Sequence, residues 1–126
     1  MTAPFKTCLL IDDNYIDSFI TRRVLESSNF AENIIVRQSP MEAIESLKSG
    51  SVNPDVIFLD IRMPMMSGFE FLQEFAGLDI AKKRIKIYML SSSLDPTDIR
   101  ESEDNKHITQ FIHKPLTVKA LEEICQ

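Results

Sequence analysis

The sequence lacks the features of membrane-spanning, secreted and disulfide-stabilised proteins. Its longest apolar runs are about five residues, whereas about 20 are needed to cross a bilayer. The N-terminus does not have the positive, apolar and small-residue pattern that directs secretion. Cys8 and Cys125 do not have the spacing of metal ligands, so we expect them to be reduced residues of a cytoplasmic protein.

Positive charge is scarce as well. The chain has 14 Lys and Arg against 19 Asp and Glu, a net charge of −5, which disfavours binding to a nucleic-acid backbone. Hydrophobic residues make up 44% of the chain and charged residues 26%, as in ordinary globular domains. A chain of 126 residues is long enough to bury a core without disulfides or a structural metal. We therefore expect one domain over residues 1–126, with no output domain.

Short β-favouring runs alternate along the chain with segments of helical period. Several of these runs are apolar at consecutive positions, which is typical of strands covered on both faces. The predicted strands are residues 8–11, 34–36, 56–59, 85–90 and 111–112. The alternation predicts an α/β domain with a parallel sheet and right-handed crossovers. In such sheets the functional crevice lies beyond the carboxyl ends of the strands.

Local signals place the helices between these strands. Apolar residues at spacings of three and four predict one face of a first amphipathic helix, at Ile16, Phe19, Ile20 and Val24. The later helices are expected to begin at side chains that cap free backbone N–H groups, at Ser39, Ser67, Asp95 and Thr117. Two glycines are expected to end helices, at Gly50 and Gly77.

Reactive side chains follow four of the five predicted strands. They are Asp12 and Asp13, then Asp60, then Ser91, then Lys114. Three crowded carboxylates stay ionised only when a cation neutralises them, and an all-oxygen ligand set suits Mg²⁺ or Mn²⁺. An ammonium and a hydroxyl beside that metal match the oxygens of a phosphoryl group in transfer. One carboxylate is then a candidate nucleophile that forms an aspartyl phosphate. Taken singly, each residue is more often an ordinary turn or cap residue.

Together these residues resemble the receiver domain of two-component response regulators, as does the stretch from Asp60 to Gly68, DIRMPMMSG. The resemblance extends from about Lys6 to about Ile124. It implies a flavodoxin-like (βα)5 fold, a doubly wound five-stranded parallel sheet with strand order 2-1-3-4-5. It also implies a phosphorylation-dependent switch whose donor is a sensor histidine kinase or a histidine phosphotransfer protein. The signal is expected to leave through a downstream protein target, with no membrane or nucleic-acid partner.

The resemblance assigns roles around the acceptor. Asp60 is expected to accept the phosphoryl group. Asp13 and Asp60 are expected to bind Mg²⁺ or Mn²⁺ directly, Asp12 through a water molecule, and Arg62 through its backbone carbonyl. Arg62 and Ser93 are expected to flank the site and to set the lifetime of the phosphoryl group.

Three further residues are implied at the ends of the last two strands. Ser91 and Lys114 are expected to contact phosphoryl oxygens, and the Lys114–Pro115 peptide is expected to be cis. Phe111 matches the aromatic switch residue of the family, although a buried residue of the last strand is an equally good interpretation.

Three other functions are weighed against this one. A phosphohydrolase of the haloacid dehalogenase type would have a second Asp two residues after Asp60, where this chain has Arg62. A nucleotide-binding module would need a glycine-rich turn after the first strand, where Asp12 and Asp13 stand. A docking module that works without phosphorylation stays open. We expect no enzyme activity beyond the chain's own phosphorylation and dephosphorylation.

Overall fold

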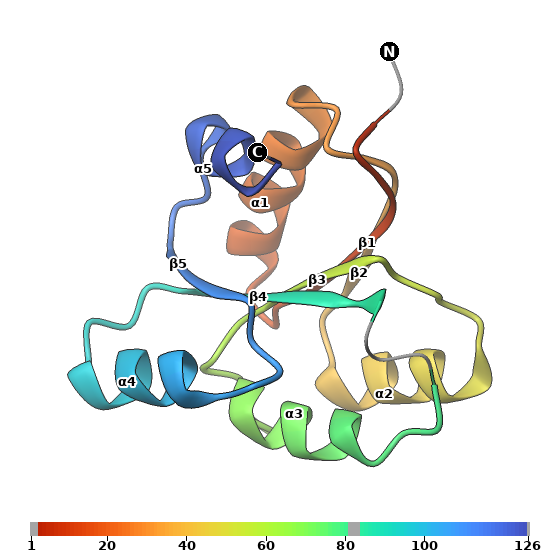
Figure 1. Ribbon diagram of the computed structural model, residues 1–126, viewed down its shortest axis with the longest axis vertical. Coiled ribbons are helices and arrows are strands. Elements are labelled where there is room, and N and C mark those ends of the chain that lie inside the picture. Colours follow the sequence, from red (N-terminus) through yellow and green to blue (C-terminus); the bar gives the residue numbers. More distant parts are fainter. Residues whose placement is uncertain (1–2, 81–83, 126) are drawn as a thin grey trace.

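Five parallel strands form a single sheet in the computed structural model, which describes residues 3–80 and 84–125 (Figure 1). The order across the sheet is β2-β1-β3-β4-β5, as predicted. The strands are β1 (Phe5–Ile11), β2 (Ala31–Arg37), β3 (Val56–Leu59), β4 (Lys86–Ser91) and β5 (Gln110–His113). The helices are α1 (Tyr15–Ser27), α2 (Pro40–Ser49), α3 (Gly68–Ala76), α4 (Pro96–Asp104) and α5 (Val118–Ile124).

Two cores lie on opposite faces of the sheet. Figure 1 shows α1 and α5 on one face and α2, α3 and α4 on the other. In β1, Leu9 and Ile11 belong to the core under α2 and α3, whereas Cys8 and Leu10 belong to the core under α1 and α5. All four residues of β3 are buried, which explains its unbroken apolar run.

The helix starts follow the predicted caps. The Ser67 hydroxyl accepts the N–H of Glu70 and the Glu70 carboxylate accepts the N–H of Ser67, which is a complete capping box. The other expected caps also accept a backbone N–H of their helix, namely Ser39, Asp95 and Thr117. Gly50 has a φ of 80°, a left-handed conformation that glycine adopts without strain.

Helix α1 is where the sequence predicts, but of its apolar stripe only Val24 packs against the core, and the other three residues are exposed. The exposed fractions are 68% for Ile16, 55% for Phe19 and 47% for Ile20. The buried residues of α1 are instead Ser18, Thr21 and Leu25. The Ser18 hydroxyl donates to the Tyr15 carbonyl at 3.0 Å, so its burial leaves no unpaired donor.

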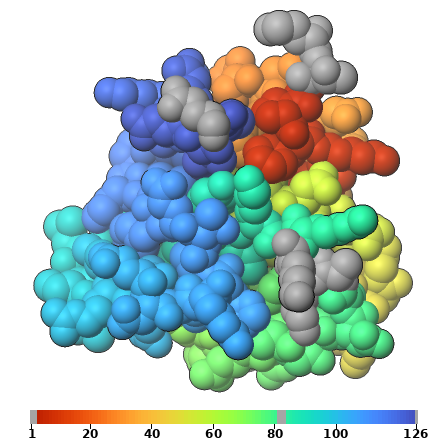
Figure 2. All heavy atoms as spheres, in the orientation of Figure 1, coloured from red at the N-terminus to blue at the C-terminus, as the bar shows by residue number. Residues whose placement is uncertain are grey.

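Helix α4 buries no large apolar side chain. Its buried residues are Asp98 and Ser102, whereas α3 buries three large apolar side chains. A cavity of about 410 Å³ lies between α4 and β5, and its lining includes Ile99, Ile108 and Phe111. The two elements lie side by side at the surface (Figures 1 and 2). Polar contacts at the start of α4 therefore contribute much of its attachment. In the part of the chain that is described, no helix is long and apolar enough to span a bilayer.

Candidate functional site

Three carboxylates meet beyond the carboxyl ends of β1 and β3. Asp12 and Asp13 follow β1, and Asp60 follows β3. Each offers one oxygen atom, and these oxygens lie within 4.8 Å of one another. Asp12 is 1% exposed and Asp60 is 7% exposed, so water screens their mutual repulsion poorly. The structure thus brings together the three carboxylates that the strand pattern predicts.

Lys114 reaches the same site from the end of β5. Its Nζ donates hydrogen bonds to Asp12 Oδ2 at 2.8 Å and to Asp17 Oδ2 at 2.9 Å, and lies 3.7 Å from Asp60 Oδ1. Burial lowers the pKa of Lys114, but the hydrogen bonds to Asp12 and Asp17 and the charges of Asp60 and Asp12 together hold the pKa above its usual value. The side chain is therefore a charged ammonium. The Lys114–Pro115 peptide is cis, as predicted.

The Asp60 carboxyl group is a poor anion in this environment. Burial is the main cause that raises the pKa of Asp60, from 3.8 to about 6. The charges of Asp12 and Asp13 act in the same direction, and the Lys114 ammonium acts against them. A positive charge in addition to the Lys114 ammonium would favour the charged form of Asp60.

A divalent cation fits this donor set. Asp12, Asp17 and Asp60 pair with the ammonium of Lys114, and Asp13 adds a further carboxylate beside Asp12 and Asp60. Oxygen-only donors and an excess of negative charge are what Mg²⁺ and Mn²⁺ require. The carboxylate cluster is therefore a candidate site for such an ion.

Ser91 and Arg62 are linked through the start of α4. The Ser91 hydroxyl accepts the N–H of Ser93 at 3.1 Å. The Ser93 hydroxyl then donates to Asp98 Oδ2 at 2.7 Å, and Arg62 Nη2 donates to the same oxygen at 2.6 Å. We call this group of Arg62, Ser93 and Asp98 the α4 clasp. It joins the loops after β3 and β4, which flank Asp60 and Ser91, to the first turn of α4.

The loop after Asp60 is held closed by a glycine. The Gly68 N–H donates to the Ile61 carbonyl at 2.8 Å. A Cβ atom at Gly68 would lie only 2.5 Å from the Asp60 carbonyl oxygen. Only glycine lets the start of α3 approach Asp60 this closely. Arg62 lies inside this loop, where its backbone carbonyl is the expected metal ligand.

Phe111 lies in β5, beside Met89 of β4. It is partly buried against the core on the α2, α3 and α4 side of the sheet. Its ring centroid is 5.4 Å from that of His113, in an edge-to-face arrangement. This packing suits an ordinary strand residue as well as the switch aromatic implied by the resemblance.

Sequence reasoning missed two carboxylates at the site, Asp17 and Asp98. Each lies in the first turn of a helix, three residues after the N-cap residue, Asn14 for α1 and Asp95 for α4. An acidic residue in a first turn is favoured by the helix dipole alone. The sequence signal therefore places these residues but does not indicate their second partners, Lys114 and Arg62.

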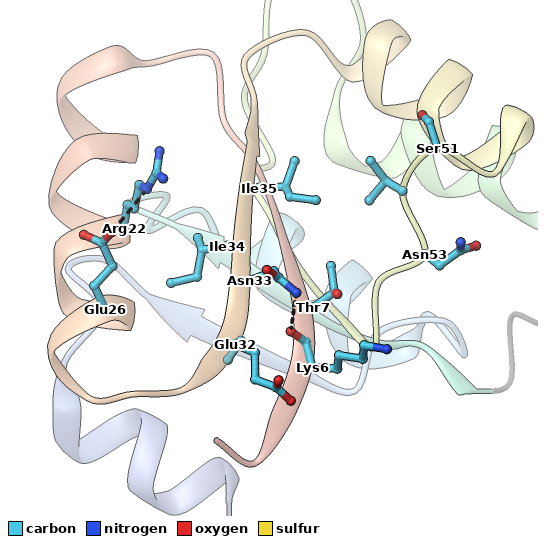
Figure 3. Close-up of a pocket in the computed structure, with 12 residues that line it drawn as sticks. Lys6, Thr7, Arg22, Glu26, Glu32, Asn33, Ile34, Ile35, Ser51 and Asn53 are labelled. Atoms are coloured by element: carbon cyan, nitrogen blue, oxygen red, sulfur yellow. Dashed lines mark hydrogen bonds and ion pairs between the residues drawn. The ribbon is translucent and has the colours of Figure 1, made fainter. Parts of the chain in front are cut away.

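A cavity of about 800 Å³ lies away from the carboxylates, around the edge strand β2. Figure 3 shows Arg22 and Ile34 on one side of the strand and Ile35, Ser51 and Asn53 on the other. The space is thus two shallow surfaces along an edge, with none of the site residues in its lining.

The sequence matches the family of response regulator receiver domains over residues 8–126. The chain belongs to this family. It is 32% identical over 97% of its length to hybrid signal transduction histidine kinase C of Dictyostelium discoideum, but spans only 10% of that protein. It is 28% identical to response regulator Rcp1 of Synechocystis, covering 98% of this chain and 86% of Rcp1.

Solved receiver structures have the same fold. A two-component response regulator from Cytophaga hutchinsonii superposes with a TM-score of 0.87 at 31% identity, over 95% of this chain and 93% of that one. The phosphorylated cyanobacterial phytochrome response regulator RcpA gives a TM-score of 0.76 at 30% identity, over 95% and 88% of the two chains. The Mn²⁺-bound form of Rcp1 superposes with a TM-score of 0.75 at 27% identity, over 96% of this chain and 89% of that one.

Proposed function

We propose that this receiver domain is a signalling switch in which Asp60 accepts a phosphoryl group from a phosphohistidine. The observation that carries the proposal is the place of Asp60. Its carboxylate lies among Asp12, Asp13 and Lys114 beyond the strand ends, and Lys114 Nζ is 3.7 Å from Asp60 Oδ1. An anionic nucleophile beside a fixed cation suits phosphoryl transfer. The phosphorylated state of RcpA gives support by analogy.

In the proposed transfer, the phosphoryl group passes directly from the phosphohistidine to Asp60. An Asp60 carboxylate oxygen bonds to phosphorus while the P–N bond of the phosphohistidine breaks. The electron pair of that bond returns to the imidazole, which leaves neutral when its other nitrogen carries a proton. The Lys114 ammonium and the Ser91 hydroxyl would then donate hydrogen bonds to phosphoryl oxygens.

The proposal includes Mg²⁺ or Mn²⁺ at the carboxylates. Asp13 and Asp60 would hold the ion directly, together with the Arg62 carbonyl. Both Asp12 oxygens already accept hydrogen bonds, from Asn14 N–H and from Lys114, which supports an indirect role for Asp12. When bound, the ion would neutralise the negative charge that otherwise repels an incoming phosphate. The Mn²⁺-bound form of Rcp1 supports this assignment by analogy.

We further propose a sensor histidine kinase or a histidine phosphotransfer protein as donor, a downstream protein as target and the cytoplasm as location. One relative is itself a histidine kinase. The phosphohydrolase alternative is weaker, because Arg62 stands where the second Asp of such enzymes would be. The domain would promote only its own phosphorylation and dephosphorylation, and residues 1–126 would act as one receiver unit.

The acceptor is tested with acetyl phosphate and Mg²⁺, followed by intact mass. The parent chain should gain one phosphoryl group, and Asp60→Asn should gain none. Asp79→Asn is a matched control, because Asp79 is exposed and outside the site. Undiminished labelling of Asp60→Asn would refute the acceptor, and no labelling of the parent would favour the docking module that works unphosphorylated.

The metal ligands are tested by titrating Mg²⁺ into two variants. Asp13→Asn should weaken Mg²⁺ binding more than Asp12→Asn, because only Asp13 is proposed as a direct ligand. We expect the Mg²⁺ affinities of the two variants to differ by about tenfold, which corresponds roughly to the loss of one charge-assisted contact. Calorimetry of the phosphate-free protein measures both affinities. Equal losses, or a larger loss for Asp12→Asn, would contradict this division of roles.

A further inference from the structure

The Lys114 ammonium is held by carboxylates from two different elements. Asp12 follows β1, whereas Asp17 belongs to α1. The Nζ–Oδ2 distances are 2.8 Å for Asp12 and 2.9 Å for Asp17, so each accepts one of the three N–H groups of the ammonium. The third N–H has no such short contact to Asp60, whose Oδ1 lies 3.7 Å away. The Lys114 side chain is 11% exposed, so little water competes for these contacts.

Packing alone does not fix this ammonium. A cavity of about 320 Å³ lies next to it, lined by Asp17, Ile20, Thr21, Ser92, Lys114 and Pro115. A lysine side chain has a flexible four-carbon stem and loses considerable rotamer entropy when it is held in one place. Without Asp17, the ammonium would keep one short hydrogen bond, to Asp12, and the longer contact with Asp60, and it would be freer to turn into the cavity. Asp17 provides the second fixed point.

We propose that Asp17 is a positioning residue, which holds Lys114 beside Asp60 with one N–H left for the phosphoryl group. This inference rests on the proposed function of Asp60. A phosphoryl group on Asp60 would meet the ammonium without a large movement of Lys114, because Nζ already lies 3.7 Å from Oδ1. Donors that are placed in advance lose little entropy when the anion forms.

A simpler role for Asp17 is helix stabilisation. Asp17 lies in the first turn of α1, and its own N–H donates to Asn14 Oδ1 at 3.0 Å. A negative charge at that position stabilises a helix through the dipole. That role would change the stability of α1 but would not depend on Lys114. The two roles are therefore separated by removing Lys114.

The test measures the affinity of beryllofluoride, a phosphoryl mimic, in saturating Mg²⁺. Asp17→Ala should bind the mimic about 5- to 20-fold more weakly than the parent, the range for loss of one charge-assisted hydrogen bond. Asp17→Asn keeps an oxygen acceptor for Lys114 and should stay within about twofold of the parent. In a Lys114→Met background, Asp17→Ala should change the affinity by less than about twofold, because the group that it positions is gone.

Two controls complete the test. Glu26→Ala removes an acidic residue from the other end of α1, where Glu26 pairs with Arg22 at 3.6 Å and both side chains are 49% exposed. It should not change mimic binding. In metal-free protein, the side-chain ammonium resonance of Lys114 should move in Asp17→Ala and not in Glu26→Ala.

The outcomes distinguish this inference from the proposed function. If the parent binds no mimic and takes no phosphoryl group, the proposed function fails, and this inference fails with it. If the parent binds but Asp17→Ala binds equally well, only the inference fails. Equal losses for the Asn and Ala variants would indicate a pure charge effect, and a loss that persists without Lys114 would indicate the helix role. Either result would overturn the positioning role.

Discussion

At the scale of single residues, Asp60 combines two properties that oppose each other. Its burial suits a nucleophile that must be shielded from water, but burial also raises its pKa to about 6. A folded-state pKa above the unfolded value of 3.8 means that the charged form is less stable in the folded chain than in the unfolded chain. Without metal, Asp60 therefore reduces stability at neutral pH. The proposed role of phosphoryl acceptor, and not stability, would account for a carboxylate at this place.

The pH dependence of Asp60→Asn follows from this pKa. Above about pH 6 the parent carries the destabilising charge, so Asp60→Asn should unfold with a free energy about 1–3 kcal/mol higher. The gain should shrink as pH falls from 6 towards 4, because Asp60 of the parent then becomes protonated in the folded chain and no longer carries the destabilising charge. Urea unfolding from pH 4 to pH 8 in a chelator measures the difference. Mg²⁺ should reduce the gain at pH 7.5, because it stabilises the parent. An equal gain at pH 4 and pH 8 would contradict the shifted pKa.

At the scale of elements, the loop between β3 and α3 depends on the close approach of Gly68 to Asp60. A Cβ atom at Gly68 would be 2.5 Å from the Asp60 carbonyl oxygen and 3.1 Å from Ile61 Cα. Both neighbours are backbone atoms, so the loop itself must shift to make room. The glycine therefore supports the position of Asp60 as well as the start of the helix.

Two glycine variants test this close approach. Gly68→Ala should lower the free energy of unfolding by about 1–3 kcal/mol, the usual cost of inserting a methyl group into a tight contact. It should also slow phosphorylation of Asp60 by acetyl phosphate. Gly77→Ala is the matched control, because its Cβ would lie an ordinary 3.6 Å from the Glu74 carbonyl oxygen. Equal effects of the two variants would show that the approach at Gly68 does not matter.

The elements also show what the sequence could predict. The apolar run of β3 and the capping box at Ser67 are local signals, and both the strand and the cap are found in the structure. The stripe on α1 is mostly exposed, because spacing identifies an apolar face but not the surface that it meets. Ser18 is buried on the opposite side of α1, with its hydroxyl bonded to its own helix.

The part of the candidate site that comes from strand ends could be predicted from the sequence, and the part that comes from helices could not. Parallel strands bring their carboxyl ends to one edge, so residues that follow β1, β3, β4 and β5 can be placed together from sequence. The partners that come from helices could not be placed in this way. Asp17 and Asp98 meet Lys114 and Arg62 only through the packing of α1 and α4 onto the sheet.

At the scale of the whole molecule, α4 is the helix best placed to respond to a change at the site. It buries Asp98 and Ser102 and has a cavity of about 410 Å³ between itself and β5. The α4 clasp connects its first turn to the loops that flank Asp60 and Ser91. Elements with few buried apolar contacts open at low free-energy cost. A rearrangement at the site therefore reaches α4 and Phe111 more easily than α2 or α3.

We expect phosphorylation to change the surface formed by α4, β5 and α5 through Lys114 and Ser91. New charge-assisted hydrogen bonds to the phosphoryl group would favour one of two existing arrangements of the adjoining loops. Lys114→Ala should still be phosphorylated on Asp60, but chemical-shift changes caused by beryllofluoride should then stay near the carboxylates.

The parent should show the changes as far as Phe111 and α4, because only the parent has the ammonium that would contact the mimic. The backbone N–H of Lys114 donates to the Ser91 carbonyl at 3.0 Å, so a shift of this residue would involve the ends of both β4 and β5. A coupling of about 1–3 kcal/mol, or roughly 5- to 150-fold in affinity for a target, is typical of such switches. Phe111→Leu keeps an apolar side chain in β5 and tests whether the ring takes part in the change. If the Lys114→Ala variant transmits the shift changes as far as the parent does, the signal leaves the site by another path, and the α4 clasp is the next structure to interrupt.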